Sequence, residues 1–129
     1  MKTIDAYAMG DWFSIYHLIL GYILKEASER TDDGVQEEYE KIGRLSSAAT
    51  ILVRNRRLKF REFNPYPDPL DQPIVMKNFI GFRESFFEYL RDRHPEYMSI
   101  EVINLGNEYV DEVRKDLNYI GIDFSISHQ

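Results

Sequence analysis

The sequence predicts a predominantly α-helical α+β fold, with three or four helices and a small sheet from the C-terminal third. Segments in the first two thirds repeat apolar residues at helical spacing, whereas residues 120–126 alternate apolar and polar side chains as strands do. An all-α bundle is the alternative, because short apolar segments such as 97–103 can also be helical. A chain of 129 residues is expected to form a single domain, residues 1–129.

The first helix is expected over residues 12–29, with Asp11 as its N-cap. Most of its positions are apolar, so it should lie at the centre of the fold. Its polar residues form one narrow stripe, which consists of Ser14, His17, Gly21 and Lys25. Residues 12–24 are far shorter than the ~20 residues that cross a bilayer, so no membrane association is expected.

The second helix is expected to start at about Val35 and to extend into a basic run. Its end is open, because residues 58–63 could also form a strand. Four of the five prolines lie in residues 64–73, which predicts an extended surface loop. A third helix follows from about Val75 to Leu90, and Pro95 closes it.

The last third changes its period. Residues 97–103 are rich in strand-forming residues, and residues 120–126 alternate strictly between apolar and polar. Between these segments, Asn107 can cap a short helix that carries Val113 and Leu117 on one face.

Chemical motifs are scarce. The chain has no cysteine, which excludes disulfides, thiolate catalysis and cysteine-based zinc sites and favours a cytoplasmic location. An apolar signal-peptide segment does not follow the first residues, which agrees with that location. The chain has three histidines, His17, His94 and His128. None of them has another histidine or a carboxylate at the helical spacing of a metal site. We therefore assign no catalytic residue, metal ligand or cofactor, and expect a protein that is not an enzyme.

Charge is unevenly distributed along this acidic chain, whose net charge is −6. Residues 54–61 carry five basic groups and no acid, and Arg54, Arg57 and Arg61 share one helix face if the second helix extends that far. This cluster is either a patch for anions or RNA phosphates, or a helix C-terminus that docks onto the acidic tail. Because the surrounding charge is negative, nucleic-acid binding is not expected.

Arg83 falls within the apolar arc of the third helix, between Phe79, Phe87 and Leu90. This position predicts a buried guanidinium, which needs a carboxylate partner from another element. We interpret it as an internal ion pair, with an anchor for a partner as the alternative.

The functional hypothesis is a small, acidic binding protein that neutralises or regulates a basic protein, such as an immunity protein to a toxin nuclease. Alternatives are a nucleic-acid-associated regulator that uses residues 54–61, an enzyme whose acids meet only in three dimensions, and a homo-oligomer. The expected docking residues are acids near two helix starts: Asp32, Asp33, Glu37, Glu38, Glu108, Asp111 and Glu112.

Overall fold

The computed structural model describes residues 1–10, 13–59 and 72–127, and the side chains within 1–10, 13–54 and 81–127. These residues confirm the predicted helix-rich α+β class. Four α-helices accompany a sheet of three strands and three short 3-10 turns. In chain order the elements are β1 (Lys2–Asp5), η1 (Ala6–Ala8), α1 (Ile15–Ser28), α2 (Val35–Lys59), α3 (Gln72–Arg93), η2 (Pro95–Met98), β2 (Ser99–Ile103), η3 (Asn107–Tyr109), α4 (Val110–Ile120) and β3 (Asp123–Ile126).

The sheet is parallel throughout, with the strand order β1-β2-β3. One face is buried through Ile4, Ile100 and Val102, while Thr3 and Ser125 on the alternate positions are exposed. The prediction of a sheet from the last third was therefore incomplete, because β1 comes from the N-terminus. Parallel neighbours need a crossover connection, and α1, α2 and α3 together form the one between β1 and β2.

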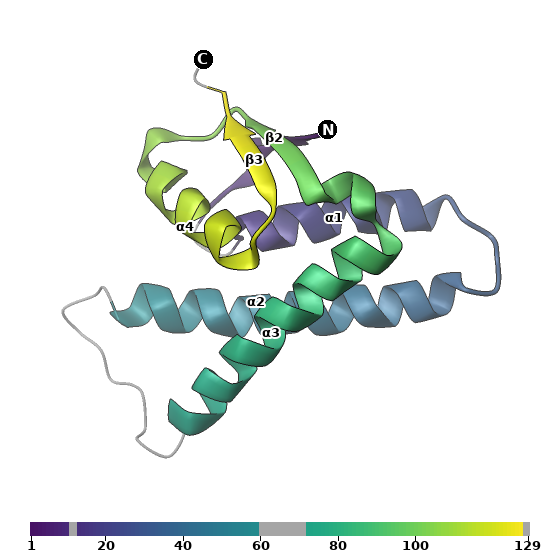
Figure 1. Cartoon of the computed structure of the whole chain (residues 1–129), viewed down its shortest axis with the longest axis horizontal. Coiled ribbons are helices and arrows are strands. Elements are labelled where there is room, and N and C mark those ends of the chain that lie inside the picture. Colours follow the sequence, from purple (N-terminus) through teal and green to yellow (C-terminus); the bar gives the residue numbers. More distant parts are fainter. Residues whose placement is uncertain (11–12, 60–71, 128–129) are drawn as a thin grey trace.

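Figure 1 shows α1 beneath the sheet and α2 further from the sheet than α1. In Figure 1, α1 and α2 run side by side, α3 crosses α2, and α4 lies beside the sheet at the other end from the α1–α2 turn. The ring of Tyr16 on α1 meets Phe82 and Phe86 of α3 edge-on, at centroid distances of 5.0 and 5.4 Å. The Tyr16 hydroxyl also donates to the Asp116 carbonyl at 2.9 Å, which ties α1 to α4.

The start of α1 differs from the prediction. Ser14 occupies the N-cap, while Asp11 and Trp12 lie outside the described residues. The backbone N–H of Ser14 donates to His17 Nδ1 at 3.0 Å, and His17 Nε2 lies 3.0 Å from Thr50 Oγ1 on α2. His17 is thus a structural residue that joins the start of α1 to α2.

Two further boundaries were predicted only in part. Helix α2 begins at Val35 as predicted, and it includes residues 58–59. Pro73 lies in the first turn of α3. Residues 60–71, which contain most of the proline segment, lie outside the described residues. The alternating segment does not begin as a strand, since Ile120 ends α4 and Gly121 reverses the chain at a φ of 88°. Glycine reaches this left-handed conformation without the steric cost of a side chain.

Candidate functional site

The turn that leads into α2 holds the first set of predicted docking acids. The Arg30 guanidinium donates two hydrogen bonds to the Asp32 carboxylate, from Nε to Oδ1 at 2.8 Å and from Nη2 to Oδ2 at 2.7 Å. Asp32 Oδ2 also accepts the Gly34 backbone N–H at 3.1 Å. Hydrogen bonding from Arg30 lowers the pKa of Asp32 to about 2. Asp32 therefore shapes this turn, whereas Asp33 beside it is exposed.

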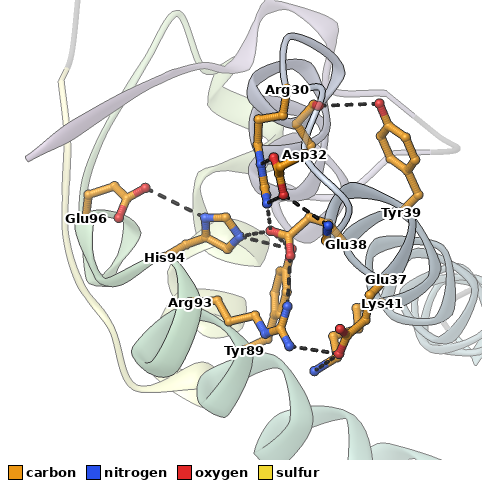
Figure 2. A network of polar contacts seen from close by, with 12 residues as sticks. Arg30, Asp32, Glu37, Glu38, Tyr39, Lys41, Tyr89, Arg93, His94 and Glu96 are labelled. Atoms are coloured by element: carbon orange, nitrogen blue, oxygen red, sulfur yellow. Dashed lines mark hydrogen bonds and ion pairs between the residues drawn. The ribbon is translucent and has the colours of Figure 1, made fainter.

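Glu38 is buried, which corrects its prediction as a docking residue. Its side chain is 3% exposed and accepts hydrogen bonds from the Tyr89 hydroxyl at 2.9 Å and from Arg93 Nη1 at 3.3 Å. His94 Nε2 contacts the same carboxylate, and Arg30 Nη1 lies 4.0 Å away. Figure 2 shows these groups from the turn, α2 and the end of α3 converging on one carboxylate. Glu38 is thus covered by residues of the chain itself.

Opposing forces act on the ionisation of Glu38. Burial by itself would raise the pKa of Glu38, but hydrogen bonds from Tyr89 and His94 outweigh it and hold the pKa below its usual value. Burial and the Glu38 charge raise the pKa of Tyr89. Glu38 therefore stays ionised while Tyr89 stays a neutral donor.

Glu37 forms the outer layer of the same network. Its carboxylate lies 2.9 Å from Arg93 Nη2 and 3.7 Å from Lys41 Nζ, while its side chain stays 58% exposed. On the other side, His94 Nδ1 lies 3.7 Å from Glu96. Asp32, Glu37 and Glu38 are thus neutralised by cations of the chain itself.

A second polar contact repeats this pattern at the end of α1. Glu26 Oε1 accepts the Tyr97 hydroxyl at 2.8 Å and lies 3.0 Å from Lys2 Nζ. Burial would raise the pKa of Glu26, but the bonds from Tyr97 and Lys2 leave it lowered. The two networks tie β1, α1, α2 and α3 together, and every buried side-chain nitrogen or oxygen in the described part of the chain has a hydrogen-bond partner. Both networks therefore stabilise the fold by joining separate elements.

The start of α4 is different. Glu108 and Asp111 are exposed, and no cation among the described residues lies within 4 Å of either carboxylate. Glu112, one position further on, is half-buried. The structure therefore divides six of the seven predicted docking acids by their surroundings. Asp32, Glu37 and Glu38 pair with cations of the chain, whereas Asp33, Glu108 and Asp111 are exposed without a described cation within 4 Å. Figure 1 shows these two helix starts at different ends of the molecule.

Two arginine predictions have different outcomes. Arg54 is exposed on α2, and the side chains of Arg57 and Arg61 lie outside the described residues, so the basic face stays a prediction. The prediction of a buried Arg83 was wrong: Arg83 is exposed, and its guanidinium lies over the Tyr119 ring of α4, 5.3 Å from the centroid. The buried face of α3 passes through Phe82, Phe86 and Leu90, which leaves position 83 at its border.

Within the described ranges, no group of three or more His, Asp or Glu residues is arranged to hold a metal ion. None of the helices found there is both long and apolar enough to cross a membrane. His128 lies outside the described residues.

Comparisons with known proteins give one similarity. No known protein family matches the chain, and no solved structure matches it. The chain is similar to the catalytic subunit of dihydroorotate dehydrogenase B (NAD(+)) from Phocaeicola vulgatus, with 28% identity over 105 residues. The match covers 73% of this chain and 35% of that protein. Because the chain spans about a third of that protein, the similarity assigns neither a family nor an activity.

Proposed function

We propose that this chain is a non-enzymatic binding module that neutralises or regulates a basic protein, as an immunity protein does for a toxin nuclease. One observation carries the proposal: Glu108 and Asp111 are exposed and lack a cation within 4 Å among the described residues, whereas Asp32 and Glu37 near the start of α2 are paired. Carboxylates without an internal partner are free to meet cations of another protein.

Topology adds a third acid to this surface. Asp5 stands at the carboxyl end of β1, and Glu108 and Asp111 open the segment that follows β2. Parallel strands end at the same edge of a sheet, and the Asn104 amide bonds Asp5 Oδ1 at 3.2 Å across that edge. The other donor to Asp5 is the neutral Tyr7 N–H. We call Asp5, Glu108 and Asp111 the acidic edge.

Electrostatics favour a basic partner for this surface. The chain carries a net charge of −6, so its long-range field attracts cationic proteins and repels nucleic acid. Enzymes that act on nucleic acids need positive surfaces to hold phosphates. An acidic protein that covers such a surface would block substrate and bind quickly.

The experiment starts with the chain as bait in extracts of its source organism, with cross-linking to locate the contact. Association of the recovered protein is then measured against ionic strength. The double variant Glu108→Lys/Asp111→Lys should slow association by about ten-fold or more and weaken its salt dependence, because steering depends on charge at the contact. Cross-links should fall near residues 104–111.

The matched control is Glu29→Lys/Glu40→Lys, which makes the same change of charge on two exposed positions away from the acidic edge and outside the predicted docking acids. Equal slowing by both double variants would show that only net charge matters and would reject the acidic edge as the contact. Recovery of a partner whose contact surface is acidic, or of none, would reject a module for basic proteins.

A further inference from the structure

A groove of about 650 Å³ runs between α2 and α3, away from the acidic edge. This volume lies within the range of about 300–1,000 Å³ that is typical of sites for small molecules. Small residues open it: Ala48 on one wall, and Gly81 and Ser85 on the other. A Cβ atom added at Gly81 would meet nothing within 4 Å, so this wall stands clear.

The groove has apolar residues at its floor and charged residues at its rim. Leu45, Ala48 and Phe82 supply its apolar atoms. Several charged groups at its rim are already neutralised within the protein. Arg93 pairs with Glu37 and Glu38, and Arg91 holds Asp92 with bonds of 2.8 and 3.2 Å.

Two opposite charges remain, one on each wall. Arg44 projects from α2 and Glu88 from α3, and both are exposed. Among the described residues, neither has an oppositely charged group within 4 Å. The exposed Ser85 lies one helical turn before Glu88 on the same wall. The groove thus presents a guanidinium and a carboxylate that face one ligand space and do not neutralise each other.

We propose that this groove binds a short zwitterionic ligand with an apolar body, namely a free apolar amino acid or a dipeptide or tripeptide of apolar residues. The ligand carboxylate pairs with Arg44, its ammonium with Glu88, and its side chains lie on Leu45, Ala48 and Phe82. A dianion such as a phosphate ester fits less well, because Glu88 and Asp92 stand on the opposite wall. The site is separate from the acidic edge and does not depend on the proposed protein partner.

The test is a titration of the isotope-labelled full chain followed by amide NMR, with the dipeptide Phe-Leu, free phenylalanine and the doubly capped acetyl-Phe-Leu-amide as probes. Phe-Leu should shift amides within residues 41–48 and 81–93. The capped peptide should bind about ten-fold more weakly or less, since it loses both charge-assisted bonds. A stronger response to phenylalanine than to Phe-Leu would identify an amino-acid site, and the reverse a peptide site.

Substitutions then distinguish specific binding of the zwitterion from non-specific apolar binding in the groove. Arg44→Gln and Glu88→Gln should each weaken Phe-Leu binding by about ten-fold. Arg114→Gln and Glu40→Gln, which remove the same charges at exposed positions outside the groove, should leave it unchanged. Equal binding of free and capped peptide, equal loss in test and control variants, or no shift at about 10 mM ligand would overturn the proposal.

Discussion

The helices α2 and α4 both begin with acidic residues, yet the fold treats the two sets differently. At α2, Arg30 pairs with Asp32 and Arg93 with Glu37, and Glu38 is buried among its donors. At α4, Glu108 and Asp111 face solvent without a described cation nearby. Acids suit the positive end of the helix dipole at both starts. The two helix starts differ in their neighbours. Arg93 at the end of α3 lies beside the acids of α2, whereas among the described residues no cation lies within 4 Å of Glu108 or Asp111.

This contrast shows what an acidic helix start does and does not reveal. The local pattern identifies a helix N-terminus and its favourable electrostatics. Whether such acids hold the protein together or remain available to a partner depends on residues distant in sequence. Glu38 and its donors Tyr89 and Arg93 are 51 and 55 residues apart. The contrast can be broken or sharpened by substitution on either side.

The largest effect is expected at Glu38. Glu38→Ala leaves the buried Tyr89 hydroxyl and the half-buried His94 without their acceptor and removes one of the two acids that pair with Arg93, so the free energy of unfolding should fall by about 1–3 kcal/mol. Denaturation in urea measures it. The control is Glu40→Ala, an exposed position two residues further along α2, which should cost about 0.5 kcal/mol or less. Similar losses in the two variants would mean that the network does not hold α2 to α3.

Lowering the pH should weaken the contacts made by the carboxylates of the polar networks around α2 and the end of α1. The folded-state pKa values of Glu38, Glu26 and Asp32 are lowered, that of Asp32 to about 2. The unfolded chain therefore binds more protons than the native one near its own carboxyl pKa values of about 4. Stability from these groups is complete above that pH and is lost as the pH falls through the folded-state values.

Urea unfolding at pH 7, 4 and 3 tests this direction. Stability should decline over that series, and Glu38→Gln should show a shallower decline from a lower starting value. A wild-type protein that becomes more stable as the pH falls from 4 to 3 would contradict the lowered pKa values.

The sequence predicted the helices and the class of the fold because these depend on local periodicity. Val35 as the start of α2 follows from the turn residues before it, whereas Asn107 does not cap the helix as predicted: Asn107 begins the turn η3, and Tyr109 is the N-cap of α4. β1 was missed, since Lys2–Asp5 has four residues of which Ile4 alone is fully buried, too few for a recognisable alternation. Its role as a strand comes from pairing with β2, where each partner residue lies 98 positions further along the chain.

The sites were less predictable than the fold. Seven docking acids were chosen from local clusters, but tertiary neighbours remove Glu38 from that set and pair Asp32 and Glu37. Arg83 was placed in the core because the helical wheel gives an angle and does not say where packing against other helices ends. The groove residues Arg44 and Glu88 carried no motif, since their relation arises only when α2 and α3 cross.

Arg83 tests how firmly α4 is attached compared with α2. Its guanidinium stacks on Tyr119 at an exposed site, where such contacts contribute about 0.5–1 kcal/mol. Arg83→Ala should therefore destabilise the protein by about that amount, with Arg83→Lys in between. Thermal and urea unfolding of both variants measure it. A loss as large as that of Glu38→Ala would restore the buried ion pair that the sequence suggested.

The smallest effect on stability is expected at the acidic edge. Glu108→Gln/Asp111→Asn removes charges that suit the dipole of α4, at a cost of about 0.3–1 kcal/mol each. It also relieves repulsion in residues 96–129, which carry two basic and seven acidic groups, a net charge of −5. These effects oppose each other and are both screened by salt, so the free energy of unfolding should change by about 0.5 kcal/mol or less, and by less still at 1 M salt. Urea unfolding at two salt concentrations measures this. A loss of several kcal/mol would show that Glu108 and Asp111 hold the protein together as Glu38 does, and the acids at α4 would then not be available to a partner.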